Sequence, residues 1–94
     1  IISEIGAGAV YGYRTNIRCK WSEEYQLDAL DEQLSTVLNN PECSGVIVWQ
    51  FADCRIDEGW FAKRPKSQNN KGVVDMYRRE KLSYAKVKEI FQTV

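Results

Sequence analysis

The sequence predicts an α/β fold made of two strand–helix units that share one parallel sheet. The strongest observation is the segment 45–53, where a glycine is followed by four large apolar residues, the first three of them aliphatic and β-branched. Such a run is typical of a strand buried on both faces, as in a parallel sheet covered by helices. The second observation is that each predicted strand is followed by a segment with apolar residues at helical spacing.

The first predicted strand covers residues 1–5 and leads into a glycine-rich loop that runs to Trp21. Gly6, Gly8 and Gly12 resemble a dinucleotide-binding fingerprint, but the third glycine comes one residue late and no helix opens after it. The loop therefore gives little support to nucleotide binding.

The first helix is predicted to begin after Ser22, which has the residue type of an N-terminal cap. Glu23 and Glu24 follow in the first turn, where carboxylates favour the positive end of the helix dipole. The helix should end near residues 39–40, because Pro41 disfavours helical geometry in the residue before it. Its apolar stripe consists of Leu27, Leu30, Leu34, Val37 and Leu38.

A last helix is predicted over residues 82–93, with Tyr84, Val87, Ile90, Phe91 and Val94 on one side. Between the second strand and this helix, residues 54–75 show no sustained period and are predicted to form a loop rich in charged and amide side chains. A loop of roughly twenty residues inside a compact domain is uncommon and is usually functional or disordered.

Composition limits the classes of partner. The 94 residues carry a formal net charge of zero, which removes the bulk electrostatic argument for nucleic acid or an anionic membrane. No apolar run approaches the ~20 residues of a membrane span. The three cysteines form no CxxC pair and there is no histidine, so we expect no metal site, and we expect free thiols in a reducing, cytoplasmic compartment.

The chain is also predicted to be a piece of a longer protein, because it begins inside a strand-like pattern without a methionine. A sheet of two parallel strands leaves both edges open and does not cover itself. We therefore expect residues 1–94 to be a quarter of a larger closed barrel. On its own, the piece should self-associate, swap elements or remain partly disordered.

Glu4 is the first candidate for chemistry, because it is a carboxylate at the predicted C-terminal end of a strand, directly before the glycine-rich loop. Trp49 and Asp53 follow the second strand and should lie on the same rim of a parallel sheet. A tryptophan beside a carboxylate suits stacking on the C–H face of a sugar. The alternatives are a structural, hydrogen-bonded glutamate and a tryptophan in the core.

Asn69 and Lys71 are candidates for binding an anionic group, since lysine supplies a point charge and asparagine a directional donor. The alternative is a solvated charged loop. A serine or cysteine nucleophile is not expected, because without histidine the usual base is missing.

Five short segments in the same order carry a family resemblance: residues 3–6 (SEIG), 21–26 (WSEEYQ), 49–53 (WQFAD), 69–72 (NNKG) and 78–81 (RREK). Together they make the chain similar to the C-terminal end of the β-glucuronidases of glycoside hydrolase family 2. The resemblance implies a (β/α)8 TIM barrel, of which residues 1–94 would be strand 7, helix 7, strand 8 and helix 8. It also implies a hydrolase of carbohydrate metabolism with a small-molecule β-glucuronide substrate and no cofactor.

The resemblance further implies roles for individual residues. Glu4 matches the catalytic nucleophile, Trp49 lines the sugar pocket, and Asn69 and Lys71 recognise the glucuronate carboxylate, while Arg64 lies near an arginine of the family. The family retains anomeric configuration, with two carboxyl groups about 5–5.5 Å apart. Its acid/base glutamate lies at the end of strand 4, outside this chain, so we expect the isolated chain to be inactive. The alternative is a small non-catalytic α/β module that binds a sugar acid or a protein partner through residues 54–75.

Overall fold

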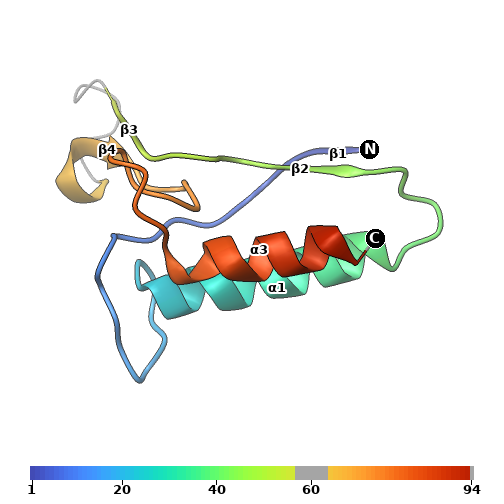
Figure 1. Cartoon of the computed structure of the whole chain (residues 1–94), viewed down its shortest axis with the longest axis horizontal. Helices are drawn as coiled ribbons and strands as arrows, with labels where there is room; N and C mark the ends of the chain where they lie inside the picture. Colours follow the sequence, from blue (N-terminus) through green and yellow to red (C-terminus); the bar gives the residue numbers. More distant parts are fainter. Residues whose placement is uncertain (57–63, 94) are drawn as a thin grey trace.

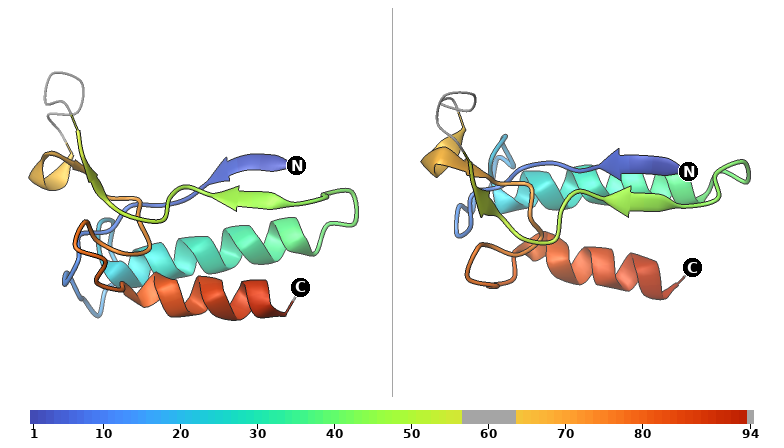
Figure 2. Two further views of the ribbon diagram at one scale, coloured as in Figure 1. Left: turned by 45° about the horizontal axis from the view of Figure 1, so that its top comes forward. Right: turned by 90° about the horizontal axis from the view of Figure 1, so that it is seen from above.

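The computed structural model describes residues 1–56 and 64–93 as two parallel strands lying over a pair of helices (Figure 1). Strand β1 spans Ile2–Ile5 and strand β2 spans Val46–Val48, and they pair in parallel with Ile2 opposite Val46 and Ile5 opposite Val48. Helix α1 covers Glu23–Leu38 and helix α3 covers Leu82–Gln92. The two helices run side by side beneath the sheet, in the direction opposite to the strands (Figures 1 and 2). The predicted order of strand, helix, strand and helix, and the parallel pairing, are confirmed.

The boundaries of α1 follow from its sequence. The Ser22 hydroxyl accepts the backbone N–H of Tyr25 at 3.1 Å, so Ser22 is the predicted N-terminal cap. The helix ends at Leu38 with Asn39 as its C-terminal cap, two residues before Pro41. Helix α3 begins at the predicted residue and ends one residue earlier than expected.

The core lies between the helices and the sheet. Its buried members come from α1, α3 and a segment that the sequence assigned to the loop, namely Leu30, Leu34, Val87 and Val73. Around them pack partly buried side chains from both strands and both helices: Ile5, Leu38, Val46, Val48, Tyr84 and Ile90. Most of the two predicted helical stripes therefore packs in this core, whereas Phe91 is 40% exposed and Val94 lies outside the described residues.

The prediction that residues 45–53 are buried on both faces is wrong for the described structure. Val46 and Val48 pack toward the helices, whereas Ile47 is 56% exposed and Phe51 is 60% exposed. Successive side chains of a strand point to opposite faces, and within the described residues helices cover only one of them. The strand is also shorter than predicted, because after Trp49 the backbone leaves β1 and bonds to residues 71–74 through Gln50, Phe51 and Asp53.

The predicted loop 54–75 contains regular structure at its base, so that prediction is wrong in part. Strand β3 (Cys54–Arg55) pairs antiparallel with β4 (Gln68–Asn69), and a 3₁₀ turn, η1, spans Pro65–Ser67. Strands of two residues are too short to give an alternating pattern, which is why the sequence did not reveal them. Residues 57–63 lie outside the described part of the chain.

Candidate active site

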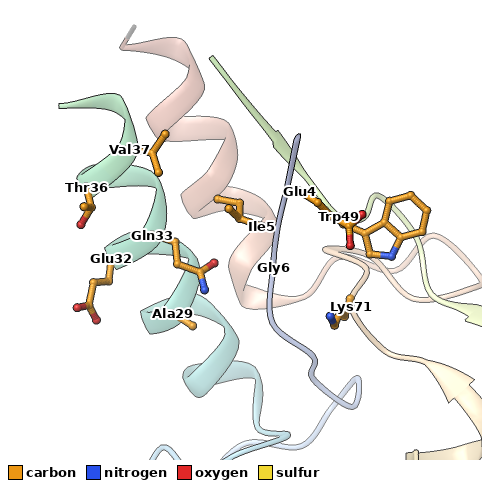
Figure 3. A pocket seen from close by; sticks show the side chains of 10 residues that line it. All are labelled: Glu4, Ile5, Gly6, Ala29, Glu32, Gln33, Thr36, Val37, Trp49 and Lys71. Carbon is orange, nitrogen blue, oxygen red and sulfur yellow. The ribbon is translucent and has the colours of Figure 1, made fainter. Parts of the chain in front are cut away.

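A cleft of about 680 Å³ opens beside the C-terminal ends of β1 and β2 (Figure 3). Glu4, Trp49 and Lys71 line it, although they come from three separate segments of the chain. Gln33 and Thr36 of α1 line the opposite side. The structure thus brings together three of the five residues that the sequence singled out for catalysis or substrate binding.

Glu4 is exposed, and no hydrogen bond or ion pair joins its side chain to the described residues. In Figure 3 it lies on the same side of β1 as Trp49, while its neighbour Ile5 lies on the side of the helices. A carboxylate in this position is available to a ligand. The alternative of a structural, hydrogen-bonded glutamate finds no partner for Glu4 among residues 1–56 and 64–93.

The ends of the two strands are held together at very short range. The backbone N–H of Trp49 donates to the carbonyl oxygen of Ile5 at 2.7 Å. A Cβ atom at Gly6 would lie 2.1 Å from the Trp49 carbonyl oxygen, so only glycine fits there. The Trp49–Gln50 peptide bond is cis. With 43% of its surface exposed, Trp49 presents its ring to the cleft rather than to the core.

Lys71 also borders a second cavity of about 520 Å³, which shares Gly6, Ala29 and Gln33 with the first. Arg64 and Lys20 line this second cavity beside the rings of Trp21 and Tyr25. The predicted cations Arg64 and Lys71 therefore both line the second cavity, which suits an anionic group.

Asn69 occupies a different position from Lys71. It lies in β4, and its side-chain oxygen accepts the backbone N–H of Lys71 at 3.0 Å. Asn69 is not one of the residues that line the two cavities. In this structure it shapes the turn that carries Lys71, and its predicted contact with substrate stays a prediction.

The chain is similar in sequence and structure to segments of several solved glycosidases. A GH2 β-galacturonidase from Eisenbergiella tayi, solved with bound galacturonate, contains a segment 56% identical to this chain, with a TM-score of 0.95 over 99% of the chain. A β-glucuronidase from Faecalibacterium prausnitzii matches 98% of the chain at 29% identity and a TM-score of 0.87. The β-glucuronidase of Ruminococcus gnavus matches 97% at 27% identity and a TM-score of 0.86.

The chain matches part of a glycoside hydrolase family 2 enzyme of the β-glucuronidase-like kind. It spans 17% of the length of the E. tayi protein and 15% of each of the two glucuronidases. No family model matches the chain, and no curated protein does. The resemblance that the five sequence segments predicted is confirmed at the level of the family.

Sequence reasoning missed a buried polar network that contacts the two neighbours of Lys71. Asp53, predicted on the rim, is only 4% exposed and pairs with Lys81 at 2.8 Å. The Lys81 ammonium group also donates to the carbonyl oxygens of Ala9 at 2.7 Å and Asn70 at 3.1 Å, so all three of its protons have acceptors. One signal was present: a lysine directly before a helix opposes the helix dipole and therefore needs another reason to be there.

Burial sets the electrostatics of this pair. It raises the pKa of the Asp53 carboxyl group, although Lys81 and the Gly72 N–H oppose the shift. It also lowers the pKa of the Lys81 ammonium group, although Asp53 opposes that shift. Burial therefore disfavours the charged form of each group, and their contact at 2.8 Å opposes this effect in both.

Within residues 1–56 and 64–93, no group of three or more His, Cys, Asp or Glu side chains is placed to hold a metal ion. In the same residues, no helix is long and apolar enough to cross a membrane.

Proposed function

We propose that this chain supplies the nucleophile and the carboxylate-binding residues of a retaining β-uronidase. The single observation that carries the proposal is the meeting of Glu4, Trp49 and Lys71 in one cleft at the C-terminal ends of two parallel strands. That end of a parallel α/β sheet is where such enzymes hold their catalytic groups. On this proposal β1, α1, β2 and α3 are strand 7, helix 7, strand 8 and helix 8 of a (β/α)8 barrel.

In the proposed mechanism Glu4 attacks the anomeric carbon while a second carboxyl group protonates the leaving oxygen. Water then hydrolyses the glycosyl–enzyme ester, and the second group acts as base, so the anomeric configuration is retained. Glu4 suits the first role because it is exposed and free of partners among the described residues. Trp49 would stack on the sugar ring, and Lys71 and Arg64 would bind the uronate carboxylate.

The sugar is proposed to be a uronic acid, with β-galacturonides preferred over β-glucuronides. The supporting observation is the 56% identity to a β-galacturonidase solved with galacturonate, against 25–29% to the β-glucuronidases. The two uronates differ only in the orientation of the 4-hydroxyl group, so both carry the carboxylate that Lys71 would bind.

The test uses the full-length protein with aryl β-galacturonide, aryl β-glucuronide and aryl β-galactoside. A uronide should be the best substrate, and Glu4→Gln should abolish turnover without lowering the melting temperature, because Glu4 is exposed and unbonded. Lys71→Ala should lower the preference for uronide over galactoside by about 10- to 100-fold, as expected for a lost charged hydrogen bond of about 1.5–3 kcal/mol. Full activity of Glu4→Gln would instead support the alternative of a non-catalytic α/β module.

The isolated 94-residue chain is proposed to be inactive, because no second carboxylate of the chain matches the acid/base residue of the family. We also propose that it self-associates through two exposed apolar side chains, Ile47 in β2 and Phe51 shortly after it. If the isolated chain hydrolyses the substrate and Glu4→Gln removes this activity, the proposed inactivity is contradicted. If the isolated chain is a monomer in size-exclusion chromatography, the proposed self-association is contradicted. A cytoplasmic location is part of the same proposal and rests on three free cysteines.

A further inference from the structure

Two buried side chains each connect the loop after Glu4 with the loop that carries Lys71. The amide nitrogen of Gln26 donates to the carbonyl oxygens of Ala7, at 3.0 Å, and Gly72, at 2.9 Å. Lys81 makes an equivalent connection two residues away on each loop, to the carbonyl oxygens of Ala9 and Asn70. Each bridge therefore has one end in residues 7–9 and the other in residues 70–72.

The bridged residues are the immediate neighbours of the candidate site. Asn70 and Gly72 flank Lys71, and the Gly72 N–H is held in turn by Asp53 at 2.9 Å. Ala7 lies three residues after Glu4 and directly follows Gly6, the glycine that packs against the Trp49 carbonyl oxygen. The backbone on both sides of Lys71 is thus fixed to the backbone that follows Glu4.

Both bridging side chains are inaccessible to substrate. Gln26 is fully buried, and the side chain of Lys81 is fully buried as well. Neither lines the two cavities that hold Glu4 and Lys71. Any effect they have on the reaction must pass through the position of the two loops.

We propose that Gln26 and Lys81 are positioning residues that fix the Lys71 ammonium relative to the Glu4 carboxylate. This proposal rests on the function proposed above. A substrate held at its carboxylate by Lys71 reaches Glu4 correctly only if the two loops keep their spacing, and a misplacement of about 1 Å can lower a rate by about 100-fold. A neutral glycoside, which lacks the carboxylate, does not depend on Lys71 in this way.

Ser83 provides the matched control, because it belongs to the same buried cluster but makes no hydrogen bond to residues 7–9 or 70–72. Its hydroxyl donates to the side-chain oxygen of Gln26 at 2.7 Å, and Ser83 is fully buried. Ser83→Ala and Gln26→Met both leave buried polar groups without partners and should both reduce stability. Only Gln26→Met removes the two loop contacts.

The experiment measures kcat/KM for an aryl β-galacturonide and for the matching aryl β-galactoside in the full-length protein. The ratio of the two values does not depend on the fraction of enzyme that is folded. Gln26→Met should lower this ratio by roughly tenfold or more, mainly through a higher KM for the uronide. Ser83→Ala should leave the ratio within about twofold of the wild type.

Gln26→Glu serves if Gln26→Met does not fold, since it keeps the size of the side chain and the Ser83 contact. A protonated carboxyl group has one donor where the amide has two, so Gln26→Glu loses at least one of the two loop contacts. It should lower the ratio by less than Gln26→Met but by more than Ser83→Ala.

The outcomes separate this inference from the proposed function. Suppose that Lys71→Ala lowers the ratio. The positioning role is then overturned if either Gln26 variant loses kcat/KM equally on both substrates, or if its ratio matches that of Ser83→Ala. A ratio that Lys71→Ala leaves unchanged would instead overturn the carboxylate contact itself.

Discussion

Glu23 of α1 accepts a hydrogen bond from the backbone N–H of Leu82, the first residue of α3, at 2.7 Å. Helix α3 has no side-chain cap of its own, because Lys81 occupies the N-cap position and its ammonium group points to Ala9, Asp53 and Asn70. The second oxygen of Glu23 accepts the N–H of Gly12 at 2.6 Å. One buried carboxylate therefore joins the start of α1, the glycine-rich loop and the start of α3.

Glu23→Gln should destabilise the protein by about 1–3 kcal/mol. The amide keeps one acceptor, so either Leu82 or Gly12 faces an NH₂ group instead of an oxygen, in a site where Glu23 is fully buried. The negative charge at the N-terminus of α3 is lost as well. Denaturant unfolding measures the change.

The matched control is Glu24→Gln, in the same helical turn. Glu24 is partly exposed, and its oxygen accepts a single N–H, that of Thr15, at 3.1 Å. We expect this substitution to lower the free energy of unfolding by no more than about 1 kcal/mol. Equal losses for the two variants would show that Glu23 is only a helix-start residue, as its sequence position suggests.

Gly6→Ala should disturb the candidate active site directly. The new Cβ would lie 2.1 Å from the Trp49 carbonyl oxygen, which belongs to backbone and has no flexible end to move aside. We expect a loss of about 1–3 kcal/mol or more in the free energy of unfolding. Turnover of the full-length protein should also fall, because Glu4 and Trp49 are fixed through the same contact.

Gly45→Ala is the control for Gly6→Ala. A Cβ at Gly45, the residue directly before β2, meets no atom within 4 Å. The free energy of unfolding should change by no more than about 0.5 kcal/mol. A tolerated Gly6→Ala would mean that β1 and β2 separate more easily at their C-terminal ends than this structure indicates.

The sequence predicted those helices and strands whose position is set by residues within the segment itself. Periodicity located α1 and α3, Ser22 and Pro41 set the limits of α1, and the apolar run at 46–48 located β2. The short strands β3 and β4 depend on pairing across residues 54–69, and two-residue strands leave no local pattern. The exposure of Ile47 depends on which elements cover the sheet, and this is not written in the segment itself.

The candidate site likewise contains residues that were predictable from local sequence and residues that depend on contacts between distant segments. The predicted ends of the two strands indicated where Glu4 and Trp49 would lie, and the family motifs indicated Lys71. The buried partners were not predictable in this way, since Gln26 contacts Gly72 across 46 residues and Lys81 contacts Ala9 across 72. Asp53 was placed on the rim from its position after β2, but the turn to residues 71–74 carries it into the interior.

Asp75 should make stability depend on pH in the acid range. One of its oxygens accepts the N–H groups of Tyr77, at 3.0 Å, and Arg79, at 2.8 Å, and the other pairs with the Arg79 guanidinium. Burial alone would raise the pKa of this carboxyl group, but the hydrogen bonds from Arg79 and Tyr77 outweigh burial and lower the pKa below its ordinary value of 3.8.

A carboxyl group whose pKa is lower in the folded protein stabilises the fold when it is ionised. The contribution of Asp75 should therefore be complete above its unfolded pKa of about 3.9 and be lost as the pH falls through the lower folded pKa. Asp75→Asn, which keeps one acceptor but no charge, should be less stable than the wild type at pH 7. The difference should shrink as the pH falls below about 4. Urea unfolding of both proteins from pH 7 to pH 3 measures it, and a difference that stays constant or grows toward acid would contradict a lowered pKa at Asp75.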